Sequence, residues 1–179
     1  HISVVSTLLS VSAAFVFAYA ITRKNIVGKS WLKYVGMLPL YVPTMFLGSG
    51  LTYIFGNKGI LTSLGWKLEL YGSTGVIIAE TLYCFPAVLS ILMVAFSSAD
   101  NRLYEAAEAM GTGLLRKFIT ITLPNVKYGL ISAIFVAFTY SFTDFGAPSV
   151  LGGNMNVFAT DVYKQVIGQQ NFNMGAVVG

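Results

Sequence analysis

The sequence has little charge, one histidine and one cysteine, and these shortages exclude several classes of protein. Among 179 residues there are 11 Lys and Arg and 7 Asp and Glu, so 10% of the chain is charged while 55% is hydrophobic. A soluble domain needs less apolar sequence than this to fill one core. The composition predicts a membrane protein, and nucleic acid is not expected as a partner.

Cysteine and histidine are too scarce for several kinds of site. Cys84 has no second cysteine to pair with, and His1 cannot make a metal site alone. We expect Cys84 to be an ordinary small side chain within a span. No nucleophile and base stand at a recognisable catalytic spacing. The chain is therefore not expected to be an enzyme, to hold a metal or to bind a cofactor of its own.

Long apolar runs, by contrast, are abundant. A helix needs about 20 mainly apolar residues to cross the hydrocarbon core of a bilayer. Four stretches qualify, over residues 2–22, 34–55, 74–96 and 128–147. They predict an all-α polytopic helix bundle in a single transmembrane domain over residues 1–179. The final run MGAVVG is typical of the start of a fifth span, so we expect the chain to be part of a longer protein.

Two of the predicted spans carry residues that disturb a regular apolar helix. Pro39 and Pro43 fall in the first turns of the second span, where the missing backbone donors should kink the helix. Glu80 lies within the third span, and Asp144 lies near the end of the fourth. Ionisable groups at membrane depth usually face a bundle interior or a water-filled path. Both acids are therefore candidates to line a translocation path, the alternative being solvated positions at the membrane interface.

Basic residues are distributed unevenly between the connections. Two segments, residues 23–33 and 97–127, hold eight of the eleven bases: Arg23, Lys24, Lys29, Lys33, Arg102, Arg116, Lys117 and Lys127. By the positive-inside rule these two segments are cytosolic. The connections over residues 57–73 and 148–173, with Lys58, Lys67 and Lys164, then lie outside.

The cytosolic segment over residues 97–127 has its own helical pattern. The run SSADN is rich in helix-capping residues, and Asp100 places negative charge where a helix dipole favours it. A stripe of apolar residues follows at helical spacing, opposite a charged face with Arg102, Glu105 and Glu108. The residues of the stripe are Leu103, Ala107, Met110 and Leu114.

The same segment changes direction after its first helix. Gly111 and Gly113 weaken helix continuation, LLRKFI supplies a second brief turn, and Pro124 is expected to end it before the fourth span. The pattern predicts two short helices folded against the cytosolic side of the membrane. One interpretation is a connector that lies on the bilayer, attracted to anionic lipid by Arg116 and Lys117.

The spacing within this segment supports a second interpretation. The order EAA, three residues, Gly, nine residues and then I-x-L-P is present at every fixed position: Glu105, Ala106, Ala107, Gly111, Ile121, Leu123 and Pro124. With this motif the chain resembles the inner-membrane permeases of binding-protein-dependent ABC importers. The resemblance extends over nearly the whole chain, including PLYVP at residues 39–43 and GAPSVLGG at residues 146–153.

The resemblance implies how the chain works with other subunits. In that family the loop is a coupling-helix pair that docks into a separate ATPase subunit, and two such ATPases bind ATP and Mg²⁺. A second permease half, an extracytoplasmic solute-binding protein and the inner membrane of a bacterium are implied with it. In this interpretation Ala106 and Ala107 permit close approach, Glu105 offers a charge to a partner's base, and Gly111 sets the angle.

The substrate is predicted only by resemblance. The run from Thr143 to Ala176 looks most like permeases for 2-aminoethylphosphonate, with ferric-iron permeases the next most similar. Glu80 and Asp144 are compatible with the ammonium group of 2-aminoethylphosphonate and with a ferric ion, so they do not distinguish these two substrates. A passive channel, which needs no docking helices, is the alternative from a different class. A membrane-embedded enzyme lacks the paired catalytic groups it needs.

Overall fold

The computed structural model describes residues 1–23, 26–66, 70–153, 155, 157–169, 172, 174 and 177. This part of the chain is helical and contains no strand. Its elements are α1 (Ile2–Arg23), α2 (Lys29–Met37), η1 (Leu38–Tyr41), α3 (Thr44–Phe55), α4 (Ile60–Ser63), α5 (Ser73–Ser97), α6 (Asn101–Ala109), α7 (Leu114–Lys117), η2 (Phe118–Thr122), α8 (Leu123–Thr143), α9 (Gly146–Leu151), α10 (Phe158–Tyr163) and η3 (Lys164–Gly168). The predicted start of a fifth span falls mostly outside the described residues.

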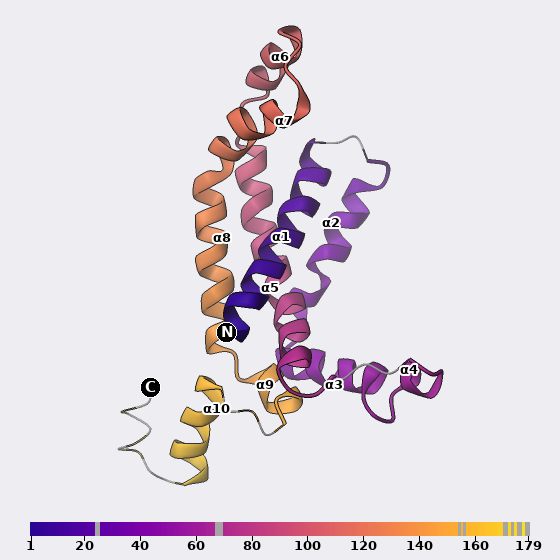
Figure 1. Ribbon diagram of the computed structural model, residues 1–179, viewed down its shortest axis with the longest axis vertical. Helices are drawn as coiled ribbons and strands as arrows, with labels where there is room; N and C mark the ends of the chain where they lie inside the picture. The colour runs from indigo at the N-terminus through magenta and orange to yellow at the C-terminus, as the bar shows by residue number, and fades with distance from the viewer. Residues whose placement is uncertain are drawn as a thin grey trace.

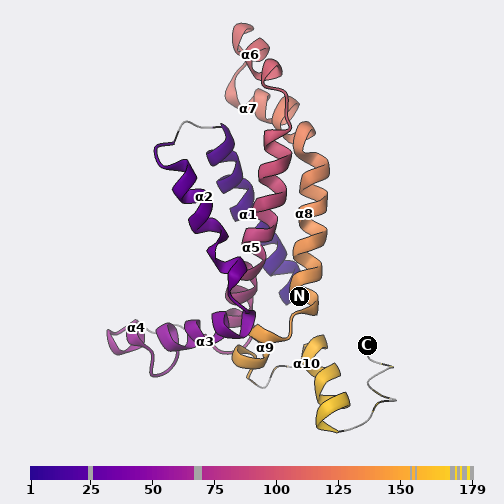
Figure 2. The same ribbon diagram turned by 180° about the vertical axis from the view of Figure 1, so that it is seen from behind.

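Three long apolar helices, α1, α5 and α8, form the body of the molecule (Figures 1 and 2). The segments Ile2–Arg23, Ser73–Ser97 and Leu114–Thr143 are each long and apolar enough to cross a membrane. Helices α1 and α5 run in the same direction, and α8 runs opposite to both. The polytopic all-α fold and the first and third predicted spans are confirmed.

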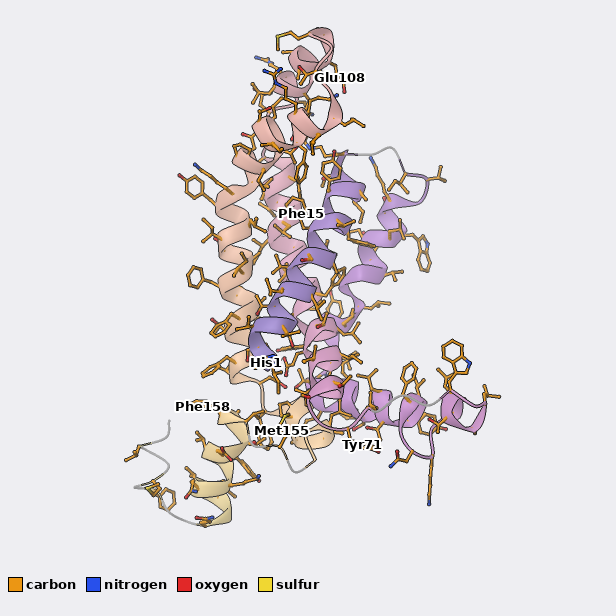
Figure 3. All side chains as sticks on the ribbon, in the orientation of Figure 1. His1, Phe15, Tyr71, Glu108, Met155 and Phe158 are labelled. Atoms are coloured by element: carbon orange, nitrogen blue, oxygen red, sulfur yellow. The ribbon has the colours of Figure 1, made fainter. Side chains whose placement is uncertain are left out.

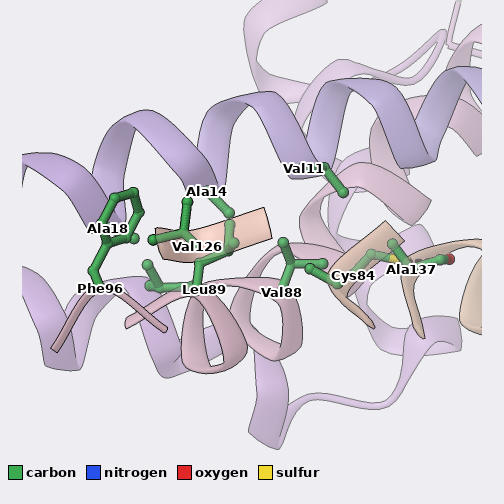
Figure 4. Close-up of a cluster of buried hydrophobic side chains, with 11 residues drawn as sticks. Val11, Ala14, Ala18, Cys84, Val88, Leu89, Phe96, Val126 and Ala137 are labelled. Atoms are coloured by element: carbon green, nitrogen blue, oxygen red, sulfur yellow. Dashed lines mark hydrogen bonds between the residues drawn. The ribbon is translucent and has the colours of Figure 1, made fainter. Parts of the chain in front are cut away.

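Small side chains let these helices approach closely. Ala14 and Ala18 of α1 and Ala133 and Ala137 of α8 are completely buried in the shared core (Figure 4). The Sγ of Cys84 in α5 lies 3.5 Å from the carbonyl oxygen of Ala137, so this cysteine is a buried packing residue as predicted. Small residues of this kind are typical of helix contacts in membranes, where van der Waals packing drives association.

The second predicted span is not one kinked helix over residues 34–55. Helix α2 begins earlier, at Lys29, and the pair Lys29–Tyr41 and Thr44–Ser63 is bent by 104°. Val42 between them has an extended backbone, and Pro43 is the N-cap of α3. Proline has no N–H to continue the ladder and restricts the residue before it to extended conformations. The consequence is a broken segment whose second half, α3, runs across the end of the bundle (Figure 1).

The fourth predicted span, over residues 128–147, also differs from the observed helix at both ends. Helix α8 ends at Thr143, and α9 begins at Gly146, so the expected end at residue 147 is wrong. At its other end α8 is continuous with α7 through the π-helical turn η2. Pro124 therefore does not end a helix but lies in the first turn of α8. The wider π turn before it accommodates a ring that would clash with an α-helical carbonyl four residues earlier.

The two ends of the bundle differ in charge. The loop end, which carries α6 and α7, lies opposite the α9 end, where His1, Tyr71, Met155 and Phe158 lie (Figure 3). Arg23, Arg102, Arg116, Lys117 and Lys127 all belong to elements at the loop end, and α2 with Lys29 and Lys33 begins there. Lys58 and Lys164 belong to the α9 end. The bases named here are thus grouped by end as the sequence predicts, while the cytosolic side stays a prediction. Lys24 and Lys67 lie outside the described residues.

Candidate functional site

Helix α6 is closed at both ends by local hydrogen bonds. The carboxylate of Asp100 accepts a hydrogen bond from the backbone N–H of Arg102 at 2.9 Å, which makes Asp100 the N-cap, as predicted. At the other end Gly111 has a φ of 67°, and the N–H groups of Gly111 and Thr112 donate to the carbonyls of Glu108 and Ala107. This is a Schellman motif, in which glycine supplies the left-handed residue. Gly111 thus sets the turn between α6 and α7.

One face of α6 is tied to the rest of the protein. Asn101, Tyr104 and Glu108 recur at spacings of three and four residues, so they share that face. The hydroxyl of Tyr104 lies 3.1 Å from Oγ1 of the buried Thr122, and Nζ of Lys117 lies 2.9 Å from Oε1 of Glu108. The two short helices are therefore fixed to one another and to the start of α8.

The end of α1 completes this attachment. The guanidinium of Arg23 donates from Nη1 to Oδ1 of Asn101 and from Nη2 to the carbonyl oxygen of Phe96 at 3.0 Å. Its Cζ lies 4.2 Å from the ring centroid of Tyr104. A cavity of about 320 Å³ lies beside these contacts, lined in part by Glu105 and Glu108.

The residues of the EAA motif divide between two faces. Glu105 and Ala106 are exposed, and the left-handed Gly111 is exposed with open space around its α-carbon. Ala107 is only 3% exposed, so its small size serves packing within this chain and not close approach by a partner. Ile121 is half-buried in η2, and Leu123 and Pro124 are exposed at the start of α8.

The predicted apolar stripe does not form a buried face. Of its four residues only Ala107 is buried, whereas Leu103, Met110 and Leu114 are 48%, 76% and 74% exposed. Leu115 is 73% exposed beside them. The inner face of α6 is occupied by the polar contacts of Asn101, Tyr104 and Glu108, so the large apolar side chains are left outside. Helices α6 and α7 project beyond the ends of α5 and α8 instead of folding back along them (Figure 1).

The second candidate site contains the two acids predicted at membrane depth. Glu80 of α5 is completely buried, and neither of its carboxylate oxygens has a hydrogen-bond partner among the described residues. Asp144 and Ser141 lie nearby. The hydroxyl of Ser141 is likewise buried without a partner in the described part of the chain. Glu80 is thus buried inside the bundle and not solvated, while its place in a translocation path stays a prediction.

Asp144 has a structural environment of its own in the break between α8 and α9. Its Oδ1 accepts a hydrogen bond from Oγ1 of Thr44 at 2.7 Å, and its Oδ2 accepts one from the backbone N–H of Ala147 at 2.9 Å. The first bond joins the broken second segment to the end of α8. The second begins α9, so the carboxylate holds the corner together.

A cavity of about 400 Å³ opens at the α9 end beside these acids. Ser141, Phe142 and Asp144 line it from the end of α8, and Val76 lines it one helical turn before Glu80. His1, directly before α1, and Phe158 of α10 also line it. In the described part of the chain no group of three His, Cys, Asp or Glu side chains is placed to hold a metal ion. The cavity offers room and carboxylate oxygen, but no enclosed metal centre.

Sequence reasoning missed the residues that hold both sites together. Arg23 was read only as a charge that sets sidedness, although an arginine placed at the end of a span can also bond the carbonyls of a neighbouring helix. Tyr104 and Thr122 are separated by 18 residues, and Thr44 and Asp144 by 100. Nothing in a single sequence indicates such long-range pairs.

Comparison with known proteins places the chain in one group. Residues 6–178 match the family described as "Binding-protein-dependent transport system inner membrane component". The Ferric transport system permease protein FbpB of Actinobacillus pleuropneumoniae is 29% identical over 94% of this chain and 25% of its own length. The Molybdenum transport system permease protein ModB of Escherichia coli is 30% identical over 86% of this chain and 69% of its own length.

A further relative is named for a different solute. The probable sulfate transport system permease protein cysT of Prototheca wickerhamii is 23% identical over 99% of this chain and 72% of its own length. The chain spans about a quarter of the length of the ferric permeases that it matches.

Proposed function

Since this chain belongs to the family of binding-protein-dependent transport system inner membrane components, we propose that it is the permease component of an ATP-driven ABC importer. The observation that carries the proposal is the exposed EAA segment, fixed at the end of the bundle where the bases gather. In this proposal the loop end is cytosolic and the bundle lies in the inner membrane of a bacterium as a multi-pass protein.

The loop over residues 97–127 is the part that we propose couples the permease to an ATPase. Glu105 and Ala106 face outward on α6, beside the exposed Leu103 and Met110. Exposed apolar side chains grouped around a charge are typical of a protein interface. A cleft of an ATPase subunit would cover them, which also explains why the apolar stripe is not buried by this chain.

The partners follow from this role. Two ATPase subunits would bind ATP and Mg²⁺ and hydrolyse the nucleotide, so the permease itself performs no chemistry. A second permease half would complete the path, and an extracytoplasmic binding protein would deliver the solute at the α9 end. Lipid would surround the outer faces of α1 and α8.

For the substrate we propose a small solute taken up past Glu80 and Asp144, with ferric iron favoured. Relatives described above are named for ferric iron, molybdenum and sulfate. Asp144 lines the cavity, and its carboxylate repels an oxyanion and attracts a hard cation. This acid thus supports iron over molybdate or sulfate, and the ferric permeases align with 94% of the chain.

Uptake of 2-aminoethylphosphonate is the second candidate. It rests on the likeness of residues 143–176 to permeases for that solute, and its ammonium group would suit the same carboxylates. None of the relatives described above is named for a phosphonate, so the comparisons support it less than iron.

The proposal is tested in cells that carry the complete system. Accumulation of radioactive iron should depend on the permease and on ATP, and an iron chelator should abolish it. The chain itself should copurify with an ATPase. Competition by 2-aminoethylphosphonate with no effect of the chelator would instead select the second candidate. Solute flux without any associated ATPase would indicate a passive channel and overturn the proposed function.

A further inference from the structure

The loop over residues 97–127 is joined by the backbone to α5 and α8 only. Helix α1, the third member of the bundle, is distant from it in sequence. Its end nevertheless lies beneath the loop, where the rings of Phe15 and Tyr19 pack edge-on against Phe96 at 5.2 and 5.8 Å and against Phe118 at 6.0 and 6.3 Å. These contacts bring α1 to the base of the loop but do not reach α6 itself.

Arg23 makes the connection to α6. Its Nη1 bonds Oδ1 of Asn101, the first residue of α6, and its guanidinium covers the ring of Tyr104, one turn further along. Its Nη2 bonds the carbonyl oxygens of Phe96 and Ala99, at 3.0 and 3.4 Å, where α5 ends. One side chain of α1 thus holds the end of α5, the start of α6 and a ring in α6 together.

The chemistry of this contact requires arginine and not merely a positive charge. A guanidinium is planar, donates from several nitrogens in a fixed fork and stacks on aromatic rings, whereas an ammonium is a compact and strongly hydrated point charge. Carbonyls at the end of a helix accept such donors well, because they lack partners within the helix and carry partial negative charge. A lysine could not make the stacked and forked set at once.

The contact continues from α6 to α8. The hydroxyl of Tyr104 lies within hydrogen-bond distance of the buried Thr122 of η2, directly before α8. Arg23, Tyr104 and Thr122 therefore form a chain of contacts from α1 through α6 to the start of α8. Any displacement of α6 acts on α1 and α8 together.

We propose that Arg23 is a positioning residue that makes α1 move with the coupling loop when an ATPase displaces it. This inference rests on the proposed function. The ordinary alternative is that Arg23 only fixes the sidedness of α1, as a base at the end of a span does. The two roles respond differently to lysine, which keeps the charge and loses the fork.

The test compares R23K with R102K, a matched substitution of an exposed arginine one residue beyond Asn101. Spin labels at the exposed Val16 of α1 and Tyr128 of α8 report the distance between the helices in the complete complex. Wild type and R102K should keep this distance between the nucleotide-free and vanadate-trapped states, because α1 and α8 both move with the loop. R23K should still bind and hydrolyse ATP, show a changed distance because α1 no longer follows the loop, and transport solute about tenfold more slowly per ATP hydrolysed.

A distance between α1 and α8 that stays the same in both states of R23K, as in wild type, would overturn the inference. If R23K does not insert, N101A decides in the same way, because it removes the acceptor of Nη1 from an exposed position of α6. N101A should lose about threefold in transport per ATP, and wild-type coupling in that variant would contradict the role of Arg23. Failure of the wild-type permease to associate with any ATPase would instead contradict the proposed function itself.

Discussion

Polar side chains at the loop end and in the interior near the α9 end differ in their hydrogen bonding. At the loop end Arg23, Tyr104 and Lys117 are each paired with a residue from another element, although Nε of Arg23 is buried without a hydrogen-bond partner among the described residues. Inside the bundle the carboxylate of Glu80 and the hydroxyls of Ser6, Ser10 and Ser141 are buried without hydrogen-bond partners among the described residues. Contacts between elements favour one geometry in the first region, whereas the polar groups of the second would gain partners if a solute or water reached them, as the proposed path requires.

The contrast indicates a division of work. A lever must transmit force without deforming, and the hydrogen bonds and the ion pair that join α1, α6, α7 and η2 provide stiffness in the proposed lever. A path must bind a solute only briefly, and unpaired groups in a largely apolar bundle are suited to exchanging partners. The hydrogen bond between Thr44 and Asp144 fixes the corner between α8 and α9, beside the proposed path.

The largest expected effect concerns which end faces the cytosol. A cysteine at Lys117 should react with an impermeant maleimide only after permeabilisation, and one at the exposed Lys58 should react in intact cells. The native Cys84 is completely buried and gives little background. The reverse pattern of labelling would place the loop end outside the cell and would contradict the proposed roles of the two ends.

The next effect is on the turn of the lever. G111A places a side chain at a φ of 67°, which costs about 1–2 kcal/mol. We expect about tenfold weaker association with the ATPase in pull-down titrations, at unchanged membrane insertion. G113A is the matched control, since Gly113 has an ordinary φ of −63° and open space around it. Equal loss in both variants would mean that surface contact and not the turn is responsible.

A smaller effect is expected from the interior acid. E80Q keeps the shape of the side chain and replaces a carboxyl group that is buried without a hydrogen-bond partner among the described residues, so the free energy of unfolding should stay equal or rise. Uptake of iron should fall about fivefold, because an amide cannot ionise to bind a cation in the proposed path. Loss of stability with unchanged uptake would show that Glu80 has a structural role and no role in transport.

The smallest effect tests the corner at Asp144. T44V removes the 2.7 Å hydrogen bond to the carboxylate and should lower the free energy of unfolding by about 1 kcal/mol, measured by thermal unfolding in detergent. T139V is the control, because the hydroxyl of Thr139 is exposed and bonds only the carbonyl of Phe135 in its own helix. Equal stability of both variants would show that the hydrogen bond between Thr44 and Asp144 does not stabilise the corner between α8 and α9.

Local patterns in the sequence predicted local features well. Asp100 and Gly111 define the start and end of α6 because capping and a left-handed turn depend on neighbouring residues alone. The apolar lengths of the first and third spans are likewise local. Pro43 indicated a kink, but the 104° bend depends on what α3 packs against after the break.

Features that depend on contacts between distant segments were not predictable. The stripe of Leu103, Met110 and Leu114 has helical spacing, yet Asn101 and Tyr104 take the inner face because Arg23 and Thr122 are there to bond them. In the same way Asp144 was seen as a charge near an interface, and its partner Thr44 lies 100 residues away. Ala107 was expected to face a partner, and burial against its own chain assigns it to packing.

The account depends most directly on the outer face of α6 docking into an ATPase. A photoreactive amino acid at the exposed Ala106 should cross-link to the ATPase subunit in membranes that hold the complete system, and the same group at Lys58 should not. Cross-linking from Ala106 should also disappear when Glu105 is replaced by lysine, because the charge offered to the partner is reversed. An Ala106 probe that labels only lipid, or a probe at Lys58 that labels the ATPase, would contradict the account.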